Sequence, residues 1–188
     1  MNKGIELASG RLIAIINADD CYKPRVFSRA AEAYSADPEA VQHGTMDILK
    51  NNRRLFTVPA PEQLDKLKKG MIINHPTVFA PRSLYDKHGG FDSEFQIAAD
   101  WDLMIRWWLN GVSFRTLPGV IADFQLGGAS YEFNHRHIEE KHAVRRKNRL
   151  YERVDCHYLL DRGKLLLPGD WIMKATLWKN CFYSRDKR

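Results

Sequence analysis

The most continuous run of apolar residues lies near the start of the chain, at Leu12–Ile16. Its members do not alternate with polar residues, which is typical of a strand that has neighbours on both sides and is buried on both faces of a parallel sheet. The run ends at Asn17, and Ala18, Asp19 and Asp20 follow directly. Because open α/β sheets bind ligands at the carboxyl ends of such strands, we expect the two carboxylates to lie at a ligand site.

Helical and extended patterns alternate along the rest of the chain, which predicts an α/β fold. Residues 1–10 have helical spacing, and the helix expected at 24–35 has Val26, Phe27 and Ala30 on its apolar face. Further helices are expected at 62–69, 83–88 and 98–108. Further strands are expected at 41–49, 55–58 and 71–80, with two more in 112–126 around Pro118 and Gly119.

Composition narrows the class of protein. A chain of 188 residues, 44% of them hydrophobic, can bury the core of a single domain. No apolar run approaches the ~20 residues that span a bilayer, and no signal peptide precedes the first strand. The three cysteines show no Cys-x-x-Cys spacing, so we expect reduced thiols and a cytoplasmic protein.

The first acidic cluster, Asp19 and Asp20, has two interpretations of equal weight. Adjacent carboxylates repel each other, and a hard divalent cation that carries a phosphorylated ligand would neutralise them. Alternatively, Asn17–Asp20 is a turn whose carboxylates cap the helix that starts near Pro24. Local chemistry alone leaves both open.

A second acidic cluster lies within Ala98–Trp108. Asp100 or Asp102 is expected to cap this helix, since a cap needs only one carboxylate. Asp102 and Arg106, four residues apart, are expected to form a pair on the solvent side. Asp100 is then left over, at the mouth of a cleft.

Loops beside these clusters carry further candidates. His75 interrupts a buried stretch, where an imidazole is normally hydrogen-bonded and structural. Gly89 and Gly90 permit positive φ or the close approach of a ligand to the backbone. Gly127 and Gly128 could hold phosphate oxygens on their backbone amides, although a plain loop explains these glycines about as well.

Two segments resemble family 2 glycosyltransferases, which have the GT-A fold. The segment NKGIELASGRLIAIINADDCYKP, residues 2–24, resembles the part that carries the family's Asp-x-Asp metal motif. HGGFD at 88–92 and AADWDL at 98–103 resemble a later part. The resemblance implies a three-layer α/β/α sandwich with a mixed central sheet and C-terminal helices. It is strongest to bacterial enzymes of cell-surface polysaccharide assembly, and it implies that the two opening, base-binding strands are absent from this chain.

The resemblance also implies roles for individual residues. Asp19 and Asp20 would bind Mn²⁺ or Mg²⁺ and the donor ribose, in an order left open. Asp100 would be the general base of an inverting transfer and should therefore be solvated or hydrogen-bonded and not deeply buried, although Ala99 replaces the family's usual acidic neighbour. The residues expected to contact donor or acceptor are Asn17, His75, Gly89, Gly90, Trp101, Asp102, Gly127 and Gly128.

The C-terminal region, 131–188, differs from the catalytic region, 1–130, in its charge. Lys141–Arg153 carries six Lys or Arg residues against one Glu. This suits a negatively charged membrane surface or a lipid-linked diphosphate better than nucleic acid, because no nucleic-acid motif accompanies it. Trp171–Trp178 has the spacing of an interfacial helix, although docking onto the core explains it equally. A metal site at His135, His137 and His142 is rejected, since these residues do not share one helix face.

We therefore expect a metal-dependent glycosyltransferase of hexosyl type. It would move a sugar from a nucleotide-diphosphate sugar to a hydroxyl of a glycan or lipid-linked acceptor, in the cytoplasm or on the inner face of the membrane. The alternative is a non-catalytic module that binds sugar nucleotides or a membrane surface. A scaffold for nucleic acid is less favoured than either.

Overall fold

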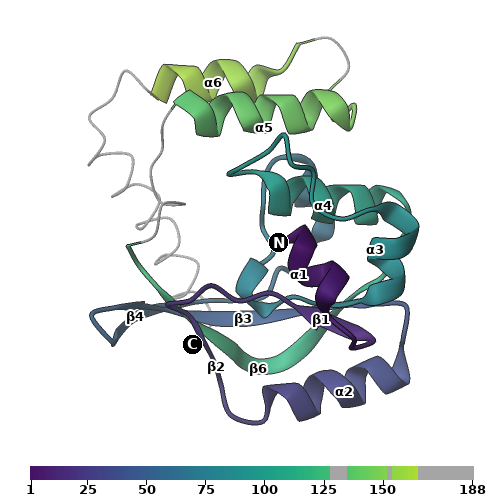
Figure 1. Ribbon diagram of the computed structural model, residues 1–188. Helices are drawn as coiled ribbons and strands as arrows, with labels where there is room; N and C mark the ends of the chain where they lie inside the picture. Colours follow the sequence, from purple (N-terminus) through teal and green to yellow (C-terminus); the bar gives the residue numbers. More distant parts are fainter. Residues whose placement is uncertain (128–134, 152–153, 165–188) are drawn as a thin grey trace.

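The computed structural model describes residues 1–127, 135–151 and 154–164, which form a mixed sheet with helices on both faces (Figure 1). The described strands follow the order β1-β5-β3-β6-β2, and β4 pairs with β3 beside this path. β3 and β6 are parallel, whereas the other pairs are antiparallel. The strands are β1 (Leu12–Ala14), β2 (Cys21–Tyr22), β3 (Val41–Lys50), β4 (Arg53–Val58), β5 (Phe79–Pro81) and β6 (Phe114–Gln125).

Helix α2 covers one face of the sheet, and α1, α3 and α4 lie on the other (Figure 1). Helices α5 and α6 lie side by side beyond α4, farther from the sheet. This arrangement confirms the predicted α/β/α fold class. The helices are α1 (Asn2–Leu7), α2 (Val26–Ala36), α3 (Arg82–His88), α4 (Ala99–Leu109), α5 (His135–Lys147) and α6 (Cys156–Lys164), with 3₁₀ turns η1 (Leu64–Lys68) and η2 (His75–Thr77).

Membrane association can be judged only for part of the chain. Among the helices just named, none combines the length and the apolar character needed to cross a bilayer. The interfacial helix predicted at Trp171–Trp178 lies outside the described residues.

Strand β1 is apolar on both faces, but it is not the parallel strand with two neighbours that its sequence predicted. It pairs antiparallel with β5 and lies at the end of the described strand order. Leu12 and Ala14 pack against the smaller core cluster around Phe79, while Ile13 packs into the main core on the opposite face. Apolar layers above and below the strand, rather than strands on both sides, therefore explain the continuous run.

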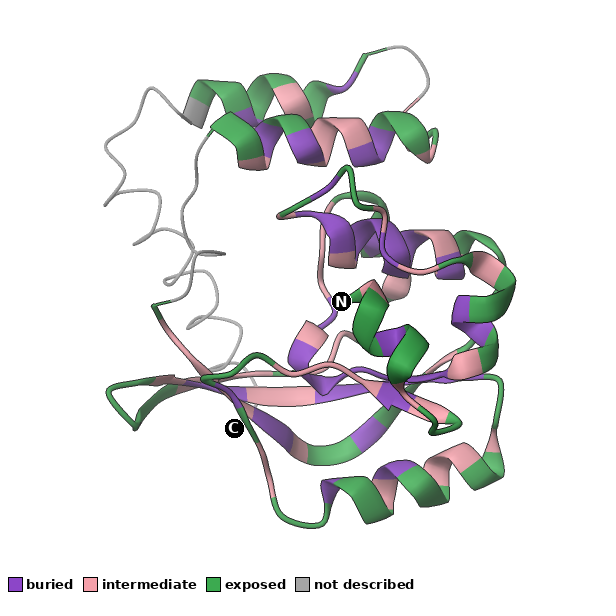
Figure 2. Cartoon of the chain, in the orientation of Figure 1, coloured by how far each residue is buried: buried purple, intermediate pink, exposed green. Residues whose placement is uncertain are grey.

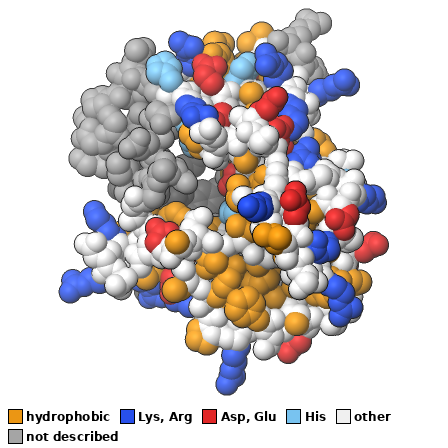
Figure 3. Space-filling view, in the orientation of Figure 1, with side chains coloured by type: hydrophobic (Ala, Val, Ile, Leu, Met, Phe, Trp, Pro, Cys, Tyr) orange, Lys and Arg blue, Asp and Glu red, His pale blue; other side chains and the backbone are white. Residues whose placement is uncertain are grey.

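The start of α2 differs from the predicted helix face. Val26 and Ala30 are buried as expected, but Phe27 is 65% exposed. Its ring packs edge-on against Tyr22 at a centroid distance of 5.2 Å. Hydrophobic side chains gather at the surface in the lower part of Figure 3, on the side of the molecule where α2 lies. The aromatic contact with β2 holds Phe27 at the margin of the smaller core cluster rather than inside it.

The segment around Pro118 and Gly119 is one continuous strand, β6, and not the two strands predicted. Gly119 has φ +73°, and the register between β3 and β6 shifts beside it. The guanidinium of Arg29, on α2, donates to the carbonyl oxygens of Pro118 and Val120. The irregularity is therefore a bulge that stays in the sheet, because a helix side chain satisfies carbonyl groups that the ladder leaves free.

The main core is centred on α4, which is buried along nearly its whole length (Figure 2). Trp101 and Trp107 are fully buried, and the indole N–H of Trp101 donates to the carbonyl oxygen of Leu67 at 2.7 Å. A helix buried on almost all sides is held by its packing. The acidic residues in the first turn of α4 are therefore placed by the core.

His43 lies in β3 and is a strand residue, as predicted. It is 2% exposed, and burial lowers its pKa to about 4 from 6.5. The unfolded chain binds a proton below pH 6.5 while the folded protein does not, so we expect the free energy of unfolding to fall as the pH drops from 6.5 towards 4.

The variant His43→Leu removes this titration. Between pH 6.5 and pH 4 both proteins should lose stability, but the variant should lose about 3 kcal/mol less of its free energy of unfolding than the unchanged protein. The remaining slope belongs to other groups, including His137, whose pKa burial also lowers. Urea unfolding at a series of pH values measures the difference, and equal slopes would contradict a buried neutral imidazole at this position.

Candidate active site

The turn after β1 separates the two carboxylates of the first acidic cluster. Asp20 is buried, and its two oxygens accept hydrogen bonds from Asn17 Nδ2 at 2.9 Å and from the backbone N–H of Gln125 at 3.0 Å. Burial raises the pKa of Asp20, although these hydrogen bonds act in the opposite direction. Asp19 is exposed. Asp20 thus joins the turn to the end of β6, and the carboxylate of Asp19 stays at the surface.

Neither of these carboxylates caps helix α2. Strand β2 lies between the turn and the helix, and the N-cap residue, Arg25, makes no side-chain cap hydrogen bond. The predicted turn does form, since the N–H of Asp20 donates to the carbonyl oxygen of Asn17 at 3.2 Å. The turn is therefore right and its predicted capping role is wrong.

Asp100 lies in the first turn of α4 and is half-buried. One carboxylate oxygen accepts the backbone N–H of Trp101 at 2.7 Å. Burial raises the pKa of Asp100, while the charge of His75 acts to lower it. The carboxylate is hydrogen-bonded, as expected, but it is not simply solvated, because the packing of α4 draws it towards the core.

His75 connects the two acidic clusters. Burial lowers the pKa of His75, while the negative charges of Asp100 and Asp20 both act to raise it. Charge effects of this kind require short separations. Asp20, His75 and Asp100 come from three distant segments of the sequence, and His75 lies near enough to both carboxylates to feel their charge.

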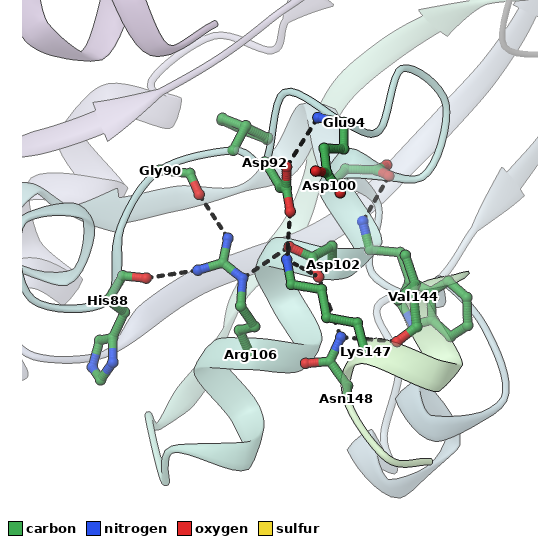
Figure 4. Close-up of polar contacts among 12 residues, drawn as sticks. His88, Gly90, Asp92, Glu94, Asp100, Asp102, Arg106, Val144, Lys147 and Asn148 are labelled. Carbon is green, nitrogen blue, oxygen red and sulfur yellow. Dashed lines mark hydrogen bonds and ion pairs between the residues drawn. The ribbon is translucent and has the colours of Figure 1, made fainter. Parts of the chain in front are cut away.

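Trp101 and Asp102 point into the protein. Asp102 is completely buried, and its carboxylate accepts hydrogen bonds from Arg106 Nε at 2.8 Å and from Lys147 Nζ at 3.0 Å (Figure 4). The pair with Arg106 exists, but it is not on the solvent side as predicted, because α5 covers this face of α4. Trp101 is 1% exposed. Neither side chain presents a surface to a donor or acceptor.

The Gly89–Gly90 loop is held by two side chains. Arg106 donates to the carbonyl oxygens of His88 and Gly90, both at 2.6 Å (Figure 4). The side-chain amide of Asn2 donates to the carbonyl oxygen of Phe91 and accepts its N–H. A Cβ on Gly90 would lie 2.6 Å from Asn2 Oδ1, so glycine makes room for this side chain. Gly89 has φ +78°, which favours glycine. These contacts explain both glycines without a ligand.

The second glycine pair lies at the limit of the described chain. Gly127 is exposed, with φ +140°, just after β6. Gly128 lies outside the described residues, so the predicted phosphate contact of this loop stays a prediction.

The basic stretch Lys141–Arg153 is only partly available at the surface. Arg145 is buried, and its Nε lies 2.7 Å from Asp155 Oδ2. Lys147 bonds to Asp92 at 2.7 Å and also to Asp102. These two side chains therefore bind carboxylates of the protein itself, Asp155 for Arg145 and Asp92 and Asp102 for Lys147. The sequence predicted that the whole stretch would face a membrane or an acceptor.

Comparisons with known proteins relate this chain to glycosyltransferases. The sequence model of glycosyl transferase family 2 matches residues 1–89. The resemblance to family 2 glycosyltransferases is confirmed. A PGL/p-HBAD biosynthesis glycosyltransferase of Mycobacterium tuberculosis (strain H37Ra) is 28% identical over 134 residues, which cover 69% of this chain and 51% of the relative. An uncharacterized glycosyltransferase of M. tuberculosis (strain H37Rv) is 36% identical over 110 residues, or 56% of this chain and 42% of the relative.

The glycosyltransferase similarity extends to solved structures. S. aureus TarS 1-349 in complex with UDP-GlcNAc has a TM-score of 0.58 at 14% identity, over 82% of this chain and 47% of that one. The complex of the same protein with UDP has a TM-score of 0.56 at 16% identity, over 82% and 45%. At these identities the likeness shows the fold. The chain spans about half the length of the curated relatives it matches.

The family match covers only part of the candidate site. Residues 1–89 include both carboxylates of the first acidic cluster and His75, but not Asp100. The nearness of Asp100 to His75 is therefore a finding of the structure and not of the family match.

The described residues offer few protein ligands for a divalent cation. Within residues 1–127, 135–151 and 154–164, no cluster of three or more His, Cys, Asp or Glu side chains suits a metal ion. The oxygens of Asp20 already accept hydrogen bonds, whereas Asp19 is exposed. Mg²⁺ is commonly bound by one or two carboxylates together with substrate phosphates. The exposed carboxylate of Asp19 would supply one ligand of this kind.

Sequence reasoning missed Glu140 on α5. The N-cap residue of α4 is Ala98 and not Asp100 or Asp102, contrary to the prediction, although Asp100 accepts one first-turn N–H, that of Trp101. The backbone N–H groups directly before the helix, those of Gln96, Ile97 and Ala98, donate to Glu140 Oε2. Glu140 follows Arg136 by four residues, a spacing that is typical of an exposed ion pair on a helix. No local pattern therefore signals its contact with the distant residues 96–98.

Proposed function

We propose that this chain carries the reacting centre of an inverting glycosyltransferase, metal-dependent and of hexosyl type, that works at the cytoplasmic face of the membrane. It moves a sugar from a nucleotide-diphosphate sugar to a hydroxyl of a glycan or lipid-linked acceptor in polysaccharide biosynthesis. The approach of Asp20 and Asp100 to the same imidazole, His75, is the observation that supports it. The complexes of TarS with UDP and UDP-GlcNAc support a nucleotide sugar as donor.

In the proposed reaction Asp100 is the general base. It takes the proton from the acceptor hydroxyl, whose oxygen attacks the anomeric carbon on the face opposite the diphosphate. The bond from this carbon to the diphosphate oxygen breaks in the same displacement, so the configuration inverts. A raised pKa makes the Asp100 carboxylate a stronger base for this proton. Mn²⁺ or Mg²⁺ on Asp19 would neutralise charge on the departing diphosphate.

A transfer assay tests the proposed function. The chain is incubated with Mn²⁺, a panel of nucleotide sugars, and glycan and lipid-linked acceptors. The expected result is a nucleoside diphosphate released in proportion to a glycosylated acceptor of inverted anomeric configuration, seen by NMR. Donor binding without turnover would instead favour the non-catalytic module, and absence of both would refute the proposal.

The two carboxylates of the first cluster should respond differently to substitution. Asp19→Asn is expected to weaken the binding of Mn²⁺ and donor by at least about 10-fold while stability is unchanged, because Asp19 is exposed. Asp20→Asn is expected to lower the free energy of unfolding by about 1–3 kcal/mol, because its buried oxygens serve Asn17 and Gln125. Titration calorimetry and urea unfolding measure the two effects. Equal losses of binding and stability in both variants would contradict this division of roles.

A further inference from the structure

Helix α5 reaches the loop in front of α4 through one carboxylate. Glu140 Oε2 accepts the backbone N–H groups of Gln96, Ile97 and Ala98 at 3.0, 2.7 and 3.0 Å. Its other oxygen, Oε1, accepts from Arg136 Nε at 2.9 Å. A single side chain thus orders three consecutive peptide groups directly before the first turn of α4.

The same helix also holds the beginning of this loop. Lys147 Nζ lies 2.7 Å from Asp92 Oδ2, and Asp92 Oδ1 accepts the N–H of Glu94 (Figure 4). The loop 92–98 is therefore fixed to α5 at both ends. Beyond it, the N–H of Asp102 donates to the carbonyl oxygen of Ala98 at 2.9 Å, so the fixed peptide groups continue into α4.

Glu140 is buried and ionised, an arrangement that is costly unless its hydrogen bonds are complete. It is 8% exposed. Burial acts to raise the pKa of Glu140, but the hydrogen bonds from Ala98, Ile97 and Arg136 outweigh burial and lower it. The contact is thus satisfied on both oxygens and suits a rigid support.

We infer that Glu140 is a positioning residue that sets the place of the Asp100 carboxylate through the backbone of Gln96–Ala98. This inference rests on the proposed function of Asp100 as base. Only Ala99 separates the anchored peptide groups from Asp100, so a movement of the loop moves that carboxylate directly. A general base misplaced by about 1 Å costs about 10²-fold in rate without loss of substrate binding.

Three variants on one helix test the inference. Glu140→Ala removes the acceptor, whereas Glu140→Gln keeps one side-chain oxygen for the three amides. Glu139→Ala is the matched control, because among the described residues Glu139 bonds to Tyr158 and Arg162, at the exposed side of α5. We expect Glu140→Ala to lower kcat about 10²-fold with an unchanged KM for donor. Glu140→Gln should restore most of the rate, and Glu139→Ala should match the unchanged protein.

A second measurement does not depend on turnover. Hydrogen exchange of the amides of Gln96–Ala98 and the carboxyl pKa of Asp100, both followed by NMR, report on the loop itself. In Glu140→Ala the amides should exchange faster, and the pKa of Asp100 should move from its raised value towards 3.8 as water reaches the carboxyl. Glu139→Ala should change neither.

The possible outcomes separate the inference from the proposed function. Wild-type turnover with an equal kcat in Glu140→Ala would overturn the positioning role and leave the transferase proposal standing. An inactive wild type would count against the proposed function. Faster exchange and a shifted Asp100 pKa in Glu140→Ala would then still show that Glu140 places that carboxylate. Unchanged exchange and an unchanged Asp100 pKa in Glu140→Ala would overturn the inference whatever the activity.

Discussion

Replacing Asp100 with asparagine is expected to lower kcat by about 10²- to 10⁴-fold while donor binding stays nearly normal. Asparagine keeps the size of the side chain and an oxygen for the N–H of Trp101, but it cannot take a proton. Burial disfavours the ionised carboxylate, so the variant should be at least as stable as the unchanged protein. Steady-state kinetics, donor titration and urea unfolding measure the three quantities.

The pH dependence of turnover is a second test of the role of Asp100. Because burial raises the pKa of Asp100, turnover of the unchanged protein should decline with falling pH at a value above 3.8. Asp86→Asn, the same chemical change at an exposed position on α3, should alter neither rate nor profile. Loss of donor binding in Asp100→Asn with an intact fold would argue against its role as base.

Asp102→Ala should have the largest effect on stability, a loss of about 3–5 kcal/mol in the free energy of unfolding. Asp102 is completely buried and serves Arg106, Lys147 and Asn148. Without it, Arg106 keeps the carbonyl oxygens of His88 and Gly90, and Lys147 loses one of the two carboxylates that it contacts among the described residues. Urea unfolding monitored by tryptophan fluorescence gives the difference.

A surface pair supplies the control for this loss. Asp37 and Arg115 also form an ion pair, at 3.0 Å, but their side chains are 34% and 65% exposed. Asp37→Ala should therefore cost no more than about 1 kcal/mol. If the two variants lose equal stability, the buried network around Asp102 is not the anchor that its contacts indicate.

Local patterns were sufficient to predict most elements of the fold. The hairpin of β3 and β4 follows from two apolar runs around a polar turn, where Asn51 and Asn52 have positive φ. The partner of β1 could not be predicted in this way. Leu12 pairs with Pro81, far along the chain, and an apolar run indicates burial without saying whether strands or helices provide it.

In the candidate site too, local patterns predicted some features, whereas others depend on contacts between distant parts of the chain. Both acidic clusters could be recognised from their place after a strand and at the start of a helix. Which of the two carboxylates is exposed could not be predicted, because Asp19 and Asp20 are chemically identical neighbours. The hydrogen bonds that Asp20 accepts from Asn17 and from the distant Gln125 distinguish them. The burial of Asp102 likewise depends on α5, whose docking surface carries no local signal.

The anchoring of loop 92–98 to α5 matters for hybrids made from related enzymes. Glu140 and Lys147 both follow residue 130, outside the part that matches the family. Replacing the segment after residue 130 with that of a relative would thus remove both side chains that hold loop 92–98, although Asp19, Asp20, His75 and Asp100 of the proposed site would be retained. We expect such hybrids to be active only when the incoming segment supplies a carboxylate and an amine in the places of Glu140 and Lys147 on α5.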